Sequence, residues 1–351
     1  MIGVGIVGCN YGCKVLLPAF RGDSRCEVIA LAGSDATRTA ERARAANIAR
    51  GVGDWRVLVE DAAVAAVAIA VPPSLQPAIA RRALELDKPV FLEKPLADNL
   101  AAAHATLVAA QKSGRPAMMD FNFPELPAWQ SAKAIIDDGR IGRLRHVAVA
   151  WNLENEATRA RLKSWKTRGD GGGGLLGNFV SHCFYYLEWL CGPIAGLGGR
   201  LFLLPDGGAQ CSIALALAFA SGAGGSLQMS SASFLGSGHR IELYGEDGTL
   251  ILANPTADYF HGFALLQARR GDDRLHPVPH PDAGDDDCRD SRIAPVSRLV
   301  HRFVDACERG GPAMPGVAEG YRVQQLIDAA TRAHASGRWV DVPPPAGKER
   351  A

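Results

Sequence analysis

The run Phe91–Pro95 (FLEKP) places a lysine two residues after an apolar segment and directly before a proline. Sheets of α/β proteins bind their ligands at the carboxyl ends of the strands, so Lys94 would lie where a ligand binds. Partial burial at that position would make it easier for the ammonium group to give up its proton. We therefore interpret Lys94 as a candidate catalytic residue; the alternative is a surface lysine that pairs with Glu93.

A glycine-rich loop opens the chain and leads from an apolar run into a helical pattern, GVGIVGCNYG over residues 3–12. Glycines at such a turn let backbone N–H groups approach a pyrophosphate at the start of a helix. Asn10 stands where this fingerprint has its middle glycine, and asparagine tolerates positive φ better than most residues. The context predicts a dinucleotide-binding loop, with a tight turn that binds nothing as the alternative. Tyr11 could contact the cofactor or only pack. The predicted contacts come from Gly8, Asn10, Tyr11 and Gly12.

The end of the next predicted strand bears on which dinucleotide binds. In this type of fold an acidic residue there accepts hydrogen bonds from the ribose 2′-OH. Here that position is Gly33, followed by Ser34 and Asp35. Ser34 can donate a hydrogen bond to a phosphate oxygen, and Arg38 can pair with the same phosphate. These residues favour NADP over NAD, although Asp35 could still serve the ribose or cap the following helix.

The elements that must position these residues alternate along the first 120 residues. Short apolar runs predict strands, and segments with alanine, leucine and charged residues at helical spacing predict helices between them. This alternation is typical of right-handed βαβ units and a parallel sheet with helices on both faces. The predicted strands are 4–7, 28–32, 67–71, 90–92 and 117–121, and the predicted helices are 38–46, 75–86 and 100–112.

The pattern changes after a predicted helix over residues 128–138. Longer runs follow, some alternating polar and apolar residues, with short glycine-rich separations that are typical of antiparallel strands. We therefore expect a dinucleotide-binding domain at 1–121 and a substrate-binding and oligomerisation domain at 122–351. The predicted strands of the second domain are 144–152, 200–204, 211–220, 225–232 and 241–244, and its closing helices are 295–309 and 320–336.

A second candidate for proton chemistry lies in this later part of the chain, where a glycine run that starts at Gly172 leads to His182. Histidine can give or take a proton near neutral pH. The alternative is a satisfied core histidine, because the predicted helix around it is apolar. Basic residues just before the glycines flank Trp165 and suggest either an anionic substrate or a solvated loop or subunit contact. They are Arg159, Arg161, Lys163, Lys166 and Arg168.

Three segments in this order resemble the Gfo/Idh/MocA oxidoreductases: the strand end and turn at 70–76, the Glu-Lys-Pro element at 93–95, and the glycine-to-histidine segment at 172–182. The resemblance extends to residues 243–250 and to the closing segment 337–340. It implies an α/β Rossmann domain joined to an α/β C-terminal domain with a large, mostly antiparallel open sheet. It also implies NAD or NADP as cofactor and sugars, nucleotide sugars or cyclitols as substrates.

The resemblance also implies roles for individual residues. Lys94 would hydrogen-bond the substrate oxygen near the nicotinamide, and His182 would donate or accept the proton of the reacting hydroxyl. The family usually has an aspartate four residues before that histidine, whereas this chain has Asn178, which can orient a hydroxyl but cannot act as a base. The further cofactor contacts that it implies are Val71, Pro72, Gln76, Glu93 and Lys94, and the substrate contacts are Asn122, Trp165, Lys166, Asn178 and His182.

Composition narrows the function further. A formal net charge of +1 gives no basis for binding nucleic acid, and the eight cysteines include no Cys-x-x-Cys pair, so we predict no metal site. The lack of a signal peptide or of a membrane-length apolar run predicts a cytoplasmic protein, and we expect a homodimer or homotetramer. We predict an NADP-preferring oxidoreductase, with NAD as the alternative cofactor, for a sugar-like substrate that is anionic if the basic run before the glycines binds it. The alternatives are an NADPH-dependent reductase of a C=N or tetrapyrrole-like substrate and a non-catalytic sensor of NADP or a sugar.

Overall fold

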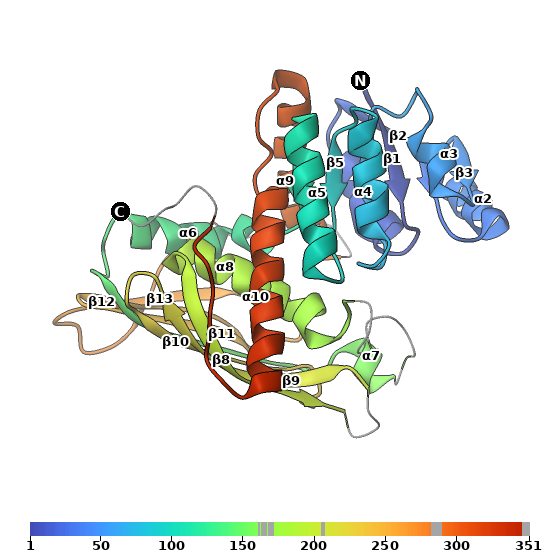
Figure 1. Cartoon of the computed structure of the whole chain (residues 1–351). Coiled ribbons are helices and arrows are strands. Elements are labelled where there is room, and N and C mark those ends of the chain that lie inside the picture. The colour runs from blue at the N-terminus through green and yellow to red at the C-terminus, as the bar shows by residue number, and fades with distance from the viewer. Residues whose placement is uncertain (161, 163–166, 168–171, 205–207, 282–289, 346–351) are drawn as a thin grey trace. The chain divides into compact units, whose positions relative to one another are not determined.

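The computed structural model describes residues 1–160, 162, 167, 172–204, 208–281 and 290–345. Contacts within the chain divide it into two compact units. The first comprises residues 1–122 and 287–324, and the second comprises residues 123–286 and 325–351. Each unit is built on a sheet of its own, parallel in the first and mostly antiparallel in the second (Figure 1).

The sheet of the first unit has six parallel strands in the order β3-β2-β1-β4-β5-β6. The strand order reverses between β1 and β4, and folds of this type bind ligands beyond the strand ends at such a reversal. The predicted alternation of strands and helices is confirmed. The short elements β3 and α3 escaped prediction because they have only three and five residues. The strands are β1 (Ile2–Val7), β2 (Cys26–Ala32), β3 (Arg50–Val52), β4 (Ala66–Ile69), β5 (Val90–Leu92) and β6 (Ala117–Met119).

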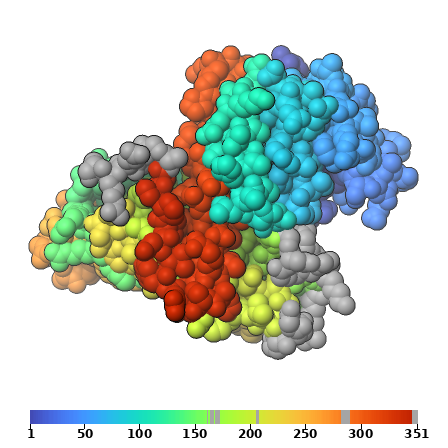
Figure 2. All heavy atoms as spheres, in the orientation of Figure 1, coloured from blue at the N-terminus to red at the C-terminus, as the bar shows by residue number. Residues whose placement is uncertain are grey.

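Helices cover this sheet. Helices α4 and α5 pack against each other on the side that faces the viewer in Figure 1, and their side chains form a continuous surface over the strands in Figure 2. The central strands β4 and β5 are therefore fully buried and consist of apolar residues throughout. The helical elements are η1 (Gly12–Leu16), α1 (Leu17–Arg21), α2 (Ala36–Ala45), α3 (Trp55–Val59), α4 (Gln76–Glu85) and α5 (Leu100–Ser113).

Helix α9 (Ile293–Arg309) comes from far along the chain yet packs into the core of the first unit. The Phe303 ring meets Phe20 and Phe91 edge to face, with centroids 6.2 Å and 5.7 Å away. Each such pair adds about 0.5–1.5 kcal/mol beyond the burial of its surface. We expected this helix to close the second domain. The structure places it in the first unit because its apolar face completes the core beside α1 and β5.

The sheet of the second unit has nine strands in the order β14-β13-β12-β11-β7-β10-β9-β8-β15. Its neighbouring strands are antiparallel except β7 and β10, which run parallel. The large, mostly antiparallel sheet that the resemblance implied is confirmed, and β12 and β13 are strands that the sequence pattern did not single out. The strands are β7 (Leu144–Asn152), β8 (Ile194–Leu203), β9 (Gln210–Phe219), β10 (Gly224–Ser230), β11 (Gly238–Gly245), β12 (Gly248–Asn254), β13 (Ala264–Arg269), β14 (His276–Pro277) and β15 (Val340–Asp341).

One face of this sheet carries α6 and α8 (Figure 1). The burial alternates along β9, where every second residue from Ile213 is buried, so the sheet has one packed and one exposed face. Within the described ranges, every helix is too short or too polar to span a bilayer. The helical elements here are η2 (Phe123–Glu125), α6 (Pro127–Asp137), α7 (Glu156–Arg159), η4 (Leu176–Val180) and α8 (Ser181–Cys191), and α10 (Val317–Ser336) spans the division between the units.

Candidate active site

The glycine loop follows β1 and packs directly on the chain that leaves β4. Gly8 has a φ of +116°, and a Cβ atom there would lie 2.1 Å from the carbonyl oxygen of Ala70. No other residue type fits that approach without moving the backbone. Gly12 opens the helical segment η1, and Asn10 is exposed between them. The loop therefore has the close backbone packing and the helix start that a pyrophosphate group needs.

The chain after β2 contains the residues expected at the adenosine ribose. A Cβ atom at Gly33 would lie 2.4 Å from Oγ1 of Thr39 and 2.6 Å from Sγ of Cys9, so a larger residue there would have to displace these side chains. Asp35 caps α2, where its Oδ1 accepts a hydrogen bond from the backbone N–H of Arg38 at 2.9 Å. Ser34, Asp35 and Arg38 are all exposed. Of the two roles that the sequence left open for Asp35, the structure shows the cap of α2.

Arg42, which the sequence analysis missed, joins α2 to the glycine loop. Its Nη1 donates a hydrogen bond to the carbonyl oxygen of Cys9 at 3.1 Å and lies 3.4 Å from Oδ1 of Asn10. The signal in the sequence was its spacing of four residues from Arg38, which puts both guanidinium groups on one face of the helix.

Gln76 positions the lysine segment from within the protein. Its side chain is 1% exposed, and its Nε2 atom lies 2.5 Å, 3.1 Å and 3.3 Å from the carbonyl oxygens of Glu93, Pro95 and Leu96. The amide therefore holds the turn that carries Lys94. We expected Gln76 to contact the cofactor, and its buried Oε1 has no hydrogen-bond partner in the described part of the chain. Val71 and Pro72, also expected at the cofactor, follow β4 and are partly exposed.

Lys94 itself is half-buried and lies two residues after the end of β5. Its backbone N–H donates a hydrogen bond to Oε2 of Glu93 at 3.2 Å, and its peptide bond to Pro95 is cis. Lys94 thus lies at the carboxyl end of a central strand, as its place after the apolar run predicted.

Asp120 follows β6 and lies close to Lys94, although the sequence analysis did not identify it. It is 1% exposed, and its Oδ2 accepts a hydrogen bond from the Tyr11 hydroxyl at 2.9 Å. Burial, followed by the charge of Glu93, raises the pKa of Asp120 well above its usual range. Burial also raises the pKa of Tyr11. Asn122, an expected substrate contact, comes two residues after Asp120 and is also buried. No described residue donates a hydrogen bond to its Oδ1.

In the second unit, the candidate residues Asn178 and His182 lie one turn apart where η4 continues into α8. The His182 ring is 8% exposed and meets the ring of Phe123 edge to face at 5.2 Å. Asn178 is half-buried and lines a small pocket with Asn155 and Thr158, with a volume of about 10 Å³. A cavity of that size holds about one water molecule. Trp165 and Lys166 lie outside the described residues.

A different histidine in this unit fits the description of a core residue. His239 is fully buried, stacks on Trp151 at 4.1 Å, and has its Nε2 3.0 Å from the Tyr186 hydroxyl. Burial lowers the pKa of His239 to about 3, so it stays neutral. The neutral ring and its packing indicate a structural role.

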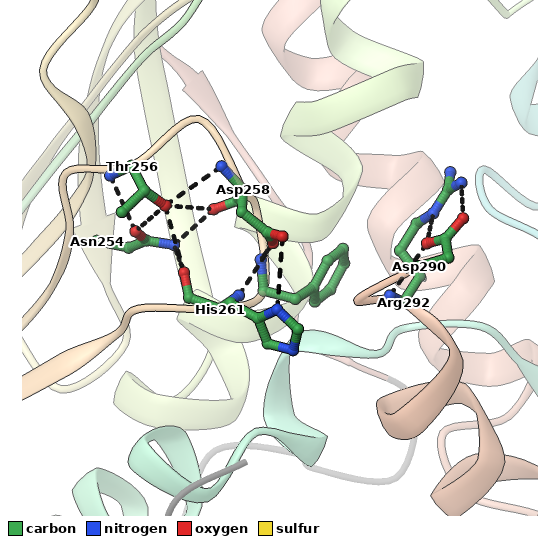
Figure 3. A network of polar contacts seen from close by, with 7 residues as sticks. Asn254, Thr256, Asp258, His261, Asp290 and Arg292 are labelled. Atoms are coloured by element: carbon green, nitrogen blue, oxygen red, sulfur yellow. Dashed lines mark hydrogen bonds and ion pairs between the residues drawn. The ribbon is translucent and has the colours of Figure 1, made fainter. Parts of the chain in front are cut away.

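The polar cluster at the end of β12 also has a structural role (Figure 3). Asn254 donates hydrogen bonds from Nδ2 to the carbonyl oxygens of Asp258 and His261 at 2.7 Å and 2.8 Å, and Thr256 donates to Oδ1 of Asn254 at 2.7 Å. Because these groups satisfy one another, they close the turn between β12 and β13. Lys94 belongs to the first unit and His182 to the second.

In the first unit, the close-packed glycines of the loop after β1 fit a dinucleotide. Comparisons with known proteins agree. Residues 2–121 match the model of the oxidoreductase family with an NAD-binding Rossmann fold, and residues 129–251 match the model of the GFO/IDH/MocA C-terminal domain.

Two relatives cover most of the chain. An uncharacterized oxidoreductase of Synechocystis sp. is 29% identical over 97% of this chain and 96% of its own length. The levoglucosan dehydrogenase of Pseudarthrobacter phenanthrenivorans is 26% identical over 87% of this chain and 86% of its own. Among solved structures, a levoglucosan dehydrogenase in complex with NADH is similar in fold, with a TM-score of 0.87, 24% identity, and coverage of 98% of this chain and 99% of that one. The chain belongs to the Gfo/Idh/MocA family of oxidoreductases, with an NAD-binding Rossmann domain at its start.

Proposed function

We propose that this oxidoreductase transfers a hydride between a nicotinamide cofactor and a secondary alcohol or ketone carbon of a sugar, nucleotide sugar or cyclitol. The observation that carries the proposal is the placement of half-buried Lys94 at the end of a central strand, on a turn held by Gln76. Family membership and the similarity to a levoglucosan dehydrogenase support a polyol-like substrate.

The first unit would bind the cofactor and the second the substrate. The cofactor, when bound, accepts or supplies the hydride. Lys94 would hydrogen-bond the reacting oxygen, and His182 would give or take its proton. Asn178 would orient a substrate hydroxyl without exchanging a proton, because an amide carries no titratable group.

Replacement of Lys94 tests this assignment. Lys94→Ala should lower turnover by orders of magnitude on a substrate chosen from a panel of sugars and cyclitols, while the cofactor Kd changes little. Unchanged turnover would refute the role of Lys94. Turnover only with a C=N or tetrapyrrole-like substrate would favour a different reductase, and tight cofactor binding with no turnover on any substrate would favour a sensor.

We also propose that NADP is preferred over NAD. Position 33 has no acidic side chain, Ser34 is exposed, and Arg38 and Arg42 are four residues apart on α2, a spacing that puts them on one face of the helix. Two cations and a hydroxyl suit the 2′-phosphate of NADP. Fluorescence titration should show tighter binding of NADPH than of NADH. Ser34→Ala and Arg38→Ala should reduce the difference, and equal affinities in the unchanged protein would contradict the proposal.

The exposed face of the second sheet supports a homodimer or homotetramer as a further proposal. Light scattering coupled to size-exclusion chromatography measures the mass directly. A monomer at micromolar concentration would contradict it.

A further inference from the structure

Three side chains from distant parts of the chain meet at one edge of the parallel sheet. Tyr11 follows β1, Glu93 follows β5 and Asp120 follows β6. The carboxyl ends of these strands lie at the same edge because the strands are parallel. The Tyr11 hydroxyl donates to Oδ2 of Asp120 at 2.9 Å, and the carboxyl group of Glu93 is within hydrogen-bonding range of Asp120.

Among the described residues, one oxygen of the Asp120 carboxyl lacks the hydrogen-bond donor that an ionised carboxylate would need. Oδ1 of Asp120 is buried, and no described residue donates a hydrogen bond to it. Two carboxyl groups can form a hydrogen bond only if one of them is protonated, and two adjacent negative charges in a buried site strongly disfavour double ionisation. Glu93 keeps part of its exposure and accepts the backbone N–H of Lys94, whereas Asp120 is 1% exposed. The proton therefore belongs on Asp120.

The other charged groups around this pair do not change that conclusion. The charge of Lys94 favours ionisation of Asp120, but burial and Glu93 outweigh it. Arg292 lies over the Tyr11 ring, 5.3 Å from its centroid, and its guanidinium is paired with Asp290 at 2.5 Å (Figure 3). Its charge is therefore largely neutralised by a carboxylate of its own.

We propose that Asp120 is a neutral carboxylic acid that shares its proton with Glu93, and that this pair, anchored by Tyr11, is a positioning group for Lys94. The two carboxyl groups together then carry one negative charge. The Lys94 ammonium, which would hydrogen-bond the reacting oxygen, then has one negative charge beside it rather than two, and its ammonium form is favoured less strongly than two charges would favour it. The role assigned to Lys94 here rests on the proposed function; the protonation of Asp120 does not.

Infrared spectroscopy of the full-length protein tests the protonation directly. At neutral pH we expect the carbonyl-stretch band of a protonated carboxylic acid, and it should shift when aspartate is labelled with ¹³C. Asp120→Asn should remove the band. The matched control is Asp23→Asn, because Asp23 is a buried aspartate of the same unit but is paired with Arg25 and His301 and should be ionised. The band should persist in that control. No aspartic acid band in the unchanged protein would overturn the proposal, even if neither variant folded.

Urea unfolding gives a second readout. A folded-state pKa above the unfolded one means that the folded chain binds more protons once the unfolded aspartate has ionised, so stability falls as pH rises above about 4. Asp120→Asn should remove that fall, and its unfolding midpoint at neutral pH should equal or exceed that of the unchanged protein. A lower midpoint, with a deficit that grows as pH rises, would mean that Asp120 is ionised and would refute the proposal.

Turnover then tests the positioning role. Asp120→Asn leaves the single charge of Glu93 in place, so the alkaline limb of the kcat/KM profile should stay at its original pH. The Glu93→Gln/Asp120→Asn double variant removes that charge and should move the limb to lower pH by about one pH unit. A limb that moves equally in Asp120→Asn alone would refute the shared proton. Absence of turnover on every polyol, with the infrared band present, would instead refute only the proposed function.

Discussion

Replacement of Gln76 by leucine would show how the lysine turn is held. The buried Nε2 atom lies within hydrogen-bonding distance of three carbonyl oxygens, those of Glu93, Pro95 and Leu96. An amide nitrogen has two N–H groups, so two of these bonds can be fully formed at one time. Leucine has a similar size but no donor, and it leaves those carbonyls without their partner.

The expected loss follows from this count. A buried carbonyl that loses its donor costs about 1–3 kcal/mol, so two of them lower the free energy of unfolding by about 2–4 kcal/mol after partial relaxation. The turn also carries Lys94, and a small displacement of a catalytic group lowers the rate by as much as about 100-fold. We therefore expect kcat in Gln76→Leu to fall roughly 10- to 100-fold, with a smaller change in the cofactor Kd.

Urea unfolding, NADPH fluorescence titration and steady-state turnover measure the three quantities separately. Gln111→Leu is the matched control, because the same substitution then falls on an exposed position of α5 in the same unit. It should leave stability and turnover close to those of the unchanged protein. If Gln76→Leu is as stable and as active as that control, the amide does not hold the turn and the reasoning is wrong.

Two further predictions concern the same unit. Asp23→Asn should lower the free energy of unfolding by about 2–3 kcal/mol at neutral pH, because hydrogen bonds from Arg25 and His301 outweigh the opposing effect of burial and hold the pKa of the Asp23 carboxyl well below its usual range. That stability is present above the unfolded pKa of about 3.9 and is lost as pH falls, so the deficit seen by urea unfolding should shrink below about pH 4, and a pH-independent deficit would contradict it. Gly8→Ala forces a Cβ atom against Ala70 at a φ of +116°, so NADPH titration should show at least about tenfold weaker binding, and an unchanged Kd would show that the loop does not contact the cofactor.

Much of the site could be predicted from local patterns. The glycine loop is recognisable because a close backbone approach leaves room for no side chain, and Gly8 meets that condition at Ala70. Lys94 is recognisable because an apolar run followed by a polar residue marks a strand end. Both patterns lie within short stretches of sequence, so they can be recognised without knowing which distant residues they contact.

The second sheet was predictable in kind but less so in detail. Alternating residues identified β7, β9 and β10, whereas β12 is buried and apolar over most of its length and lacks the alternation that marks a half-exposed strand. Helix α9 had a clear helical pattern, but its partner could not be deduced, because an apolar helix face does not specify which core it completes.

The sequence by itself determined the class of fold, the glycine loop and the lysine at a strand end. The loop and the lysine are marked by short local patterns, and the fold class follows from the order in which local strand and helix patterns alternate. Only the tertiary structure decided that Gln76 holds the turn of Lys94, that Arg42 reaches the glycine loop, and that Asp120 meets both Glu93 and the Tyr11 hydroxyl. These contacts join segments up to 109 residues apart. The pKa of a carboxyl group leaves its ordinary range only through the groups around it. Here the order of the strands in the sheet brings those groups together.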